Sequence, residues 1–323
     1  MIRGFRCSSF WKDLLFTECY IPLPNSLTNC YVFLYASMEG GQNDQDQTEA
    51  CQTGVREMKR YWADYSRRAF AELEHERIIA VQPIGAIEQH GPHLPMSVDA
   101  CTVDNLAKRL ARALPDDSPV LILPTQAVCK SDEHIDFPGT LTLTGETFGR
   151  VLTEIGASVA RAGVRKMVFL NGHGGNIPAM DQAARELRVS QGMMTFSCTW
   201  VGFGMPEGIY SAAERAHGIH AGDMETSVML ALDPDNVDMG LARDFRSRGQ
   251  DLAEKTDNIG LGRAVRPGWK TQDLNTAGAC GEAHLATVEK GEATLDHAVS
   301  GLVAAMAEID SIPLSWLDRK PET

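Results

Sequence analysis

Between residues 78 and 200 the sequence alternates short apolar runs with longer segments whose apolar residues recur at helical spacing. The short runs cover residues 78–84, 120–123, 167–170 and 194–200. Between the first two runs, Val103, Leu106, Leu110 and Leu114 recur every three or four residues, as on one face of a helix. Apolar strands joined by helices are typical of a parallel sheet covered on both faces. We therefore predict an α/β fold, a three-layer α/β/α sandwich with a mainly parallel central sheet.

The first 57 residues differ from the remainder of the chain. They contain four of the eight cysteines and a polar run over residues 40–53, and the regular alternation begins only after Met58. We expect two regions: residues 1–57, a poorly ordered N-terminal appendage, and residues 58–323, the functional domain. A translation start assigned upstream of Met58 would give the same pattern.

The charge balance excludes several classes of function. The chain has 30 Lys and Arg against 43 Asp and Glu and is therefore acidic. A nucleic-acid-binding surface needs clustered basic residues, so we expect no nucleic-acid partner. We also expect no membrane partner, because no window offers the roughly 20 predominantly apolar residues of a membrane-spanning helix. The N-terminal residues lack the pattern of a secretory signal. Together these features predict a cytoplasmic protein whose cysteines are reduced.

Side chains that can bind metals cluster after the apolar runs. One cluster, at residues 85–99, follows the first run, a second at residues 171–176 follows the third run, and a third lies at residues 217–225. Because parallel sheets bind their ligands at the carboxyl ends of the strands, we expect these clusters to meet there. Their candidate ligand side chains are Glu88, His90, Asp99, His173, His220, Asp223 and Glu225.

The spacing within the clusters favours a metal site. Glu88 and His90 are two residues apart, so on an extended chain both side chains point to the same side. A carboxylate and an imidazole presented together suit Zn²⁺ or Mn²⁺. The two oxygens of Asp99 can bridge two cations, and the glycines beside His173 allow a close approach.

Several motifs, in the same order, resemble those of the creatininase (creatinine amidohydrolase) family. They are EQHGPHLP at 88–95, FPGT at 137–140, NGHGGN at 171–176, HAGDMETS at 220–227 and ATVEKG at 286–291. The resemblance spans about residues 60–310 and makes residues 58–323 a creatininase-like metallohydrolase domain. It implies an α/β/α sandwich, a two-metal hydrolase site and a homo-oligomer, often a hexamer. Known members open the ring of creatinine, deformylate a formylaminopyrimidine nucleotide or trim a small peptide in mycofactocin maturation.

The resemblance also implies roles for individual residues. Glu88, Asp99 and His173 resemble the ligands of one cation, and His90 and Asp99 resemble those of a second, with Asp99 between the two. His220 matches the catalytic histidine of the family.

The chain departs from creatininase itself at one ligand position. Gly175 stands where creatininase has a ligating Glu, so we predict that Glu225 replaces this donor, with Asp223 as the reserve. Ala216 and Ile219 also differ from creatininase, which argues against creatinine as the substrate.

These residues predict a metal-dependent amidohydrolase that splits an amide, cyclic amide or formamide bond of a small molecule. Two divalent cations would activate water, and His220 would protonate the leaving nitrogen. We expect the cations to be Zn²⁺ and/or Mn²⁺, with Fe²⁺ as a further alternative. We expect His134, Asp223 and Trp269 to line the substrate pocket. Two alternatives stay open: a peptidase of the mycofactocin precursor-maturation type, and a non-catalytic metal- or ligand-binding member of the fold.

Overall fold

The structure, a computed structural model, describes residues 58–322, and the predicted appendage at residues 1–57 lies outside them. Its sheet has four strands, all parallel, in the order β2-β1-β3-β4. The strands are β1 (Ile79–Ile84), β2 (Val120–Ile122), β3 (Lys166–Asn171) and β4 (Met194–Thr199). Each strand lies within one residue, at either end, of a predicted apolar run.

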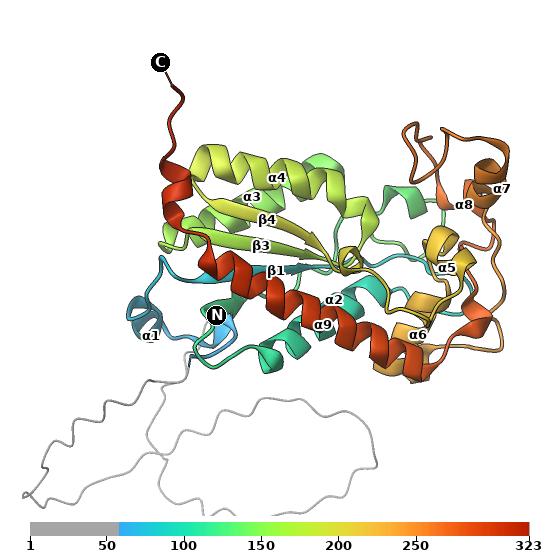
Figure 1. The fold of residues 1–323 in the computed structure, drawn as a ribbon, viewed down its shortest axis with the longest axis horizontal. Helices are drawn as coiled ribbons and strands as arrows, with labels where there is room; N and C mark the ends of the chain where they lie inside the picture. The colour runs from blue at the N-terminus through green and yellow to red at the C-terminus, as the bar shows by residue number, and fades with distance from the viewer. Residues whose placement is uncertain (1–57, 323) are drawn as a thin grey trace, which may run out of the picture. The chain divides into compact units, whose positions relative to one another are not determined.

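Helices cover both faces of this sheet, which confirms the predicted three-layer sandwich (Figure 1). One face packs against α3 and α4, and the other packs against α2, α6 and α9. Successive strand residues point to opposite faces, so Ile79 and Val81 join one core while Ala80 joins the other. The helices are α2 (Val98–Ala113), α3 (Gly145–Arg161), α4 (Ile177–Gln191), α6 (Asp223–Leu232) and α9 (Val288–Ser311).

Four shorter α-helices lie outside the two covering layers. α1 (Arg67–Ala71) precedes β1. Beyond the carboxyl ends of the strands lie α5 (Ala212–His217), α7 (Arg248–Lys255) and α8 (Thr271–Leu274) (Figure 1). Within residues 58–322, no helix combines the length and the apolar character that crossing a bilayer requires.

The strand order creates a crevice between the ends of β1 and β3. After β1 the chain forms β2 on one side of it and then β3 on the other, so the connections diverge from β1. Gly85 and Gly172 follow these two strands, and each allows α2 to approach closely. A Cβ at Gly85 would lie 2.5 Å from the Cα of Ala100, and one at Gly172 would lie 2.9 Å from the carbonyl oxygen of Asp99. The first turn of α2 therefore brings Asp99 into the crevice.

Candidate metal centre and active site

The structure brings the predicted ligand side chains together at this crevice. Within each of three groups, one ligand atom from every residue lies within 4.8 Å of the others. The groups are Glu88 with Asp99 and His173, His90 with Asp99 and Glu225, and Glu88 with His90 and His220. The first two groups share Asp99, as a carboxylate between two cations would require.

The two groups that share Asp99 have short approaches between acids and imidazoles. In the first, Nε2 of His173 lies 3.1 Å from Oε2 of Glu88, and its Nδ1 lies 3.6 Å from Oδ2 of Asp99. In the second, Nε2 of His90 lies 3.7 Å from Oδ1 of Asp99 and 3.9 Å from Oε2 of Glu225. Nδ1 of His90 donates to the carbonyl oxygen of Glu88 at 3.0 Å, which leaves Nε2 directed at the acids.

Burial strongly perturbs the acids and imidazoles of the site. Burial raises the pKa of Glu88 to about 8, despite the opposing charges of His173 and His90. Burial alone would lower the pKa of His90, but Asp99, Glu225 and Glu88 raise it to about 9. Opposite charges thus partly offset the cost of burying these groups.

Unpaired buried atoms test whether metal ions fit this site. Among the residues that the structure describes, five such atoms of the site accept or donate no hydrogen bond. They are Oε1 and Oε2 of Glu88, Nε2 of His90, Oδ2 of Asp99 and Nε2 of His173. Folded proteins rarely leave buried polar atoms unpaired, and carboxylate oxygens with imidazole nitrogens are the donors that Zn²⁺ and Mn²⁺ accept. The donor set therefore fits divalent cations.

Two asparagines hold the loop that carries His173. Asn171 donates to the carbonyl oxygen of His173 at 2.7 Å and accepts from its backbone N–H at 3.2 Å. Asn176 donates to the carbonyl oxygen of Gly85 at 2.9 Å and accepts from the backbone N–H of Lys130 at 3.1 Å. The ends of β1 and β3 are thereby tied to each other and to the segment at residue 130.

His220 lies against the carboxylate cluster in a fixed orientation. Its Nε2 donates to the carbonyl oxygen of Gln89 at 2.8 Å, so Nδ1 holds the lone pair and lies 3.8 Å from Oε1 of Glu88. Burial, with the charges of the neighbouring histidines, lowers the pKa of His220 well below its ordinary value. The ring is therefore a neutral base directed at the cluster.

His134 and Gln89 support Glu88 from a second side. The side-chain amide of Gln89 donates to Nδ1 of His134 at 2.7 Å and to the carbonyl oxygen of Gly278 at 2.9 Å. His134 must then carry its proton on Nε2, which lies 3.2 Å from Oε1 of Glu88. Gln89 was not among the predicted site residues, although it stands between two predicted ligands.

Asp223 lies away from the pocket, contrary to the expectation that it lines it. Its buried carboxylate pairs with Lys290 at 2.5 Å and accepts a hydrogen bond from Ser227 at 3.0 Å. The reason is helical geometry: Asp223 and Glu225 are two residues apart on α6, so they point to nearly opposite sides. Glu225 alone of the two reaches the metal-ligand groups.

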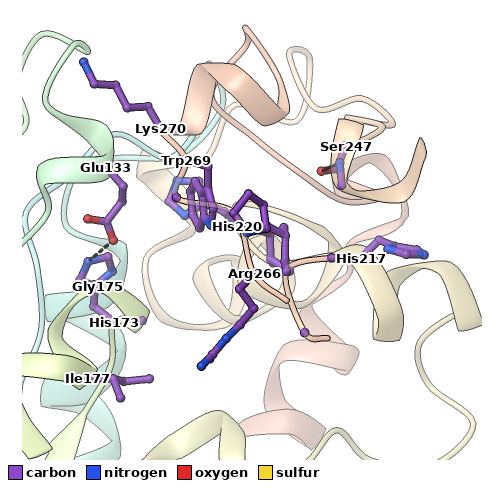
Figure 2. Close-up of a pocket in the computed structure, with 18 of the residues that line it drawn as sticks. Glu133, His173, Gly175, Ile177, His217, His220, Ser247, Arg266, Trp269 and Lys270 are labelled. Atoms are coloured by element: carbon purple, nitrogen blue, oxygen red, sulfur yellow. Dashed lines mark hydrogen bonds and ion pairs between the residues drawn. The ribbon is translucent and has the colours of Figure 1, made fainter. Parts of the chain in front are cut away.

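A cavity of about 1450 Å³ opens over the carboxylate cluster. His134, His173, His220 and Trp269 line it, and Figure 2 labels the last three. Glu133, which the sequence analysis also did not single out, lines the cavity with its carboxylate 3.4 Å from Nε2 of His173. Its only signal in the sequence was its place beside His134.

Comparisons with known proteins find one matching family and several relatives. Residues 63–306 match the family model for creatininase, described as creatinine amidohydrolase. A mycofactocin precursor peptide peptidase from Mycolicibacterium smegmatis is 34% identical over 157 residues, which are 48% of this chain and 58% of that protein. The chain thus matches less than three fifths of the length of this relative. The creatinine amidohydrolase of Pseudomonas putida is 29% identical over 269 residues, 76% of this chain and 94% of that protein.

Solved creatininase structures share the fold. A mutant creatininase described as Zn-Zn type aligns with a TM-score of 0.62 and 26% identity over 79% of this chain and 100% of that one. A structure described as creatininase Mn aligns with a TM-score of 0.61 and 25% identity over 78% of this chain and 99% of that one.

Proposed function

The chain belongs to the creatininase family, and on this premise we propose that it is a metal-dependent amidohydrolase that hydrolyses a C–N bond of a small molecule. The observation that carries the proposal is the pair of ligand groups sharing Asp99, with their unpaired buried atoms. Two divalent cations bound there would lower the pKa of a water molecule and polarise the carbonyl group of an amide. We propose Glu88, Asp99 and His173 as the ligands of one cation, and His90, Asp99 and Glu225 as those of the other.

We assign proton transfer to His220. Its Nε2–H is held by the carbonyl oxygen of Gln89, so the unprotonated Nδ1 can take a proton from the attacking water and deliver it to the leaving nitrogen. His134 acts as a positioning residue, because its Nε2–H faces Oε1 of Glu88. Trp269 lines the cavity and would pack against the substrate.

The size and charge of the cavity favour a second candidate, a peptidase of the mycofactocin precursor-maturation type. About 1450 Å³ exceeds the roughly 300–1,000 Å³ that is typical of pockets for drug-sized ligands, so a peptide segment would fit. Arg266 extends into the cavity (Figure 2), and among the described residues it forms no hydrogen bond or ion pair. Its planar guanidinium suits a carboxylate, such as the C-terminus of a peptide.

The cations are proposed as Zn²⁺ and/or Mn²⁺, in line with the metals in the descriptions of the two creatininase structures. Fe²⁺ also suits a site of imidazoles and carboxylates. We further propose a cytoplasmic protein and, from the family resemblance alone, a homo-oligomer such as a hexamer. Light scattering on the purified chain would test the hexamer.

Metal content and hydrolysis together test the proposed function. The full chain would be analysed by elemental mass spectrometry as purified, after chelation, and after reconstitution with Zn²⁺ or with Mn²⁺. A panel of cyclic amides including creatinine, N-formyl compounds and short peptides would be assayed in each state. We expect close to two metal equivalents per chain, with hydrolysis lost on chelation and restored by metal. Metal binding without hydrolysis of any compound would favour a non-catalytic member of the fold, and absence of metal binding would overturn the site itself.

A further inference from the structure

Glu133 brings a fourth acidic side chain to the candidate metal centre. It belongs to the 3-10 turn Asp132–His134, between β2 and α3, and its side chain is only 14% exposed. Its Oε1 lies 3.4 Å from Nε2 of His173, and Figure 2 shows the carboxylate directed at that ring. Glu133 therefore faces one of the unpaired ligand atoms from the cavity side.

The carboxylate of Glu133 occupies the space that a side chain at position 175 would need. A Cβ added at Gly175 would lie 2.1 Å from Oε1 of Glu133 and 2.4 Å from Nε2 of His173. Both distances are far shorter than any van der Waals contact, so a side chain at position 175 excludes Glu133 from its place. Glycine at this position leaves room for an acid that comes from a different loop.

The surrounding contacts hold Glu133 in this position. Nζ of Lys130 lies 3.8 Å from its other carboxylate oxygen, and Thr271 donates to its carbonyl oxygen at 3.1 Å. Asn176, which directly follows the glycines of the His173 loop, accepts from the backbone N–H of Lys130. The turn that carries Glu133 is thus fixed to the loop that leaves room for it.

We propose that Glu133 is part of the metal centre, where its carboxylate takes the place of a side chain at position 175 and strengthens binding of the cation that Glu88, Asp99 and His173 hold. This inference rests on the proposed function, because it assumes that a cation binds there. Acidic neighbours of metal-ligating histidines typically change metal affinity by 10–100-fold.

The test measures metal affinity by competition with a chromophoric chelator, using Zn²⁺ and the full chain. We expect E133Q and E133A to weaken binding of one Zn²⁺ equivalent by about 10–100-fold. The matched control is D132N, because Asp132 is the adjacent acid, pairs with Lys130, and has a side chain that is 59% exposed. D132N should bind Zn²⁺ as the unaltered chain does.

Variants at position 175 test whether Glu133 and a side chain at position 175 would occupy the same space. A Cβ at position 175 would press on Nε2 of His173 as well as on Glu133, so G175A should weaken binding at least as much as E133A does. E133A/G175E should bind Zn²⁺ more tightly than E133A/G175A, because both carry the same Cβ and only the first returns a carboxylate to this space. A melting curve for each variant, with and without Zn²⁺, shows whether it folds. If G175A does not fold, E133Q still tests the role of Glu133 in metal binding.

The outcomes separate this inference from the proposed function. If the unaltered chain binds no metal, the proposed function fails first. If it binds two equivalents and E133Q and E133A bind them equally well, only the role of Glu133 is overturned. Equal Zn²⁺ affinities of E133A/G175E and E133A/G175A would overturn the idea that the two positions place a carboxylate in the same space.

Discussion

The two walls of the cavity differ in how they are built. The inner wall contains the loop that follows β3, together with Asp99, His220 and Glu225. The last residues of β1 and β3, Ile84 and Asn171, pair in register behind it. A backbone bond of 2.7 Å from Gly172 to Ile84 continues that pairing beyond the strands. The outer wall, residues 253–270, forms no strand, and its bridge between Ile259 and Val265 joins only its own residues.

This difference separates the chemistry from the choice of substrate. Glu88 and His173, the ligand side chains that follow β1 and β3, are buried, and the sheet fixes the strands from which their loops extend. Most residues of the outer wall, such as Arg266, are exposed. Changes in the inner wall should therefore abolish metal binding or turnover, and changes in the outer wall should alter substrate affinity alone.

The largest effect is expected at Asp99, which both ligand groups share. Asp99→Asn should remove both cations and, because metal activation contributes several kcal/mol to catalysis, lower the rate at least about 10³-fold. Elemental mass spectrometry and the rate of hydrolysis measure the two effects. Asp104→Asn, which changes a more exposed acid on the same helix, is the control. Two equivalents of metal retained by Asp99→Asn would remove this residue from the site.

His220 should separate proton transfer from metal binding on the same wall. His220→Ala should keep both cations and lose about 10²–10⁴-fold in turnover, because a positioned acid–base group contributes a factor of this size. His217→Ala is a suitable control, since His217 lines the cavity without belonging to a ligand group. An unchanged rate would exclude His220 from the mechanism, whereas loss of one cation would make it a ligand, as its grouping with Glu88 and His90 allows.

Asp223 should affect stability and leave the metal centre intact. Removing one partner of a buried ion pair leaves the other uncompensated, and Lys290 is partly exposed, so Asp223→Asn should lower the free energy of unfolding by about 2 kcal/mol. Urea denaturation and metal analysis would be compared with those of Asp235→Asn, a change at an exposed acid nearby. Loss of metal in Asp223→Asn would contradict the assignment of Glu225 as the donor from α6.

The inner wall could largely be predicted from the sequence, and the reason is geometric. Apolar runs reveal the strands, and the ends of parallel strands lie at one edge, so the positions of Glu88 and His173 follow from the chain order. Glu133 could not be predicted in this way, because its approach to Gly175 depends on the path of the segment between β2 and α3, which has no regular period. Asp223 was misplaced because two residues that stand close together in the sequence point to nearly opposite sides of α6. Of the outer wall, only Trp269 was predicted to line the pocket, because the sequence of a loop without regular periodicity does not show where its residues lie.

The smallest effect is expected at Arg266 on the outer wall. For a substrate found in the hydrolysis screen, Arg266→Ala should raise KM about tenfold when the compound carries a free carboxylate, because a hydrogen bond to a charged group contributes about 1.5–3 kcal/mol. The KM for the corresponding carboxamide should not change, and neither kcat nor metal content should fall, because Arg266 lies outside the ligand groups. Arg248→Ala, which changes an exposed arginine that does not line the cavity, is the control. A loss of kcat without a change in KM would mean that the outer wall takes part in the chemistry, and the division between the two walls would then fail.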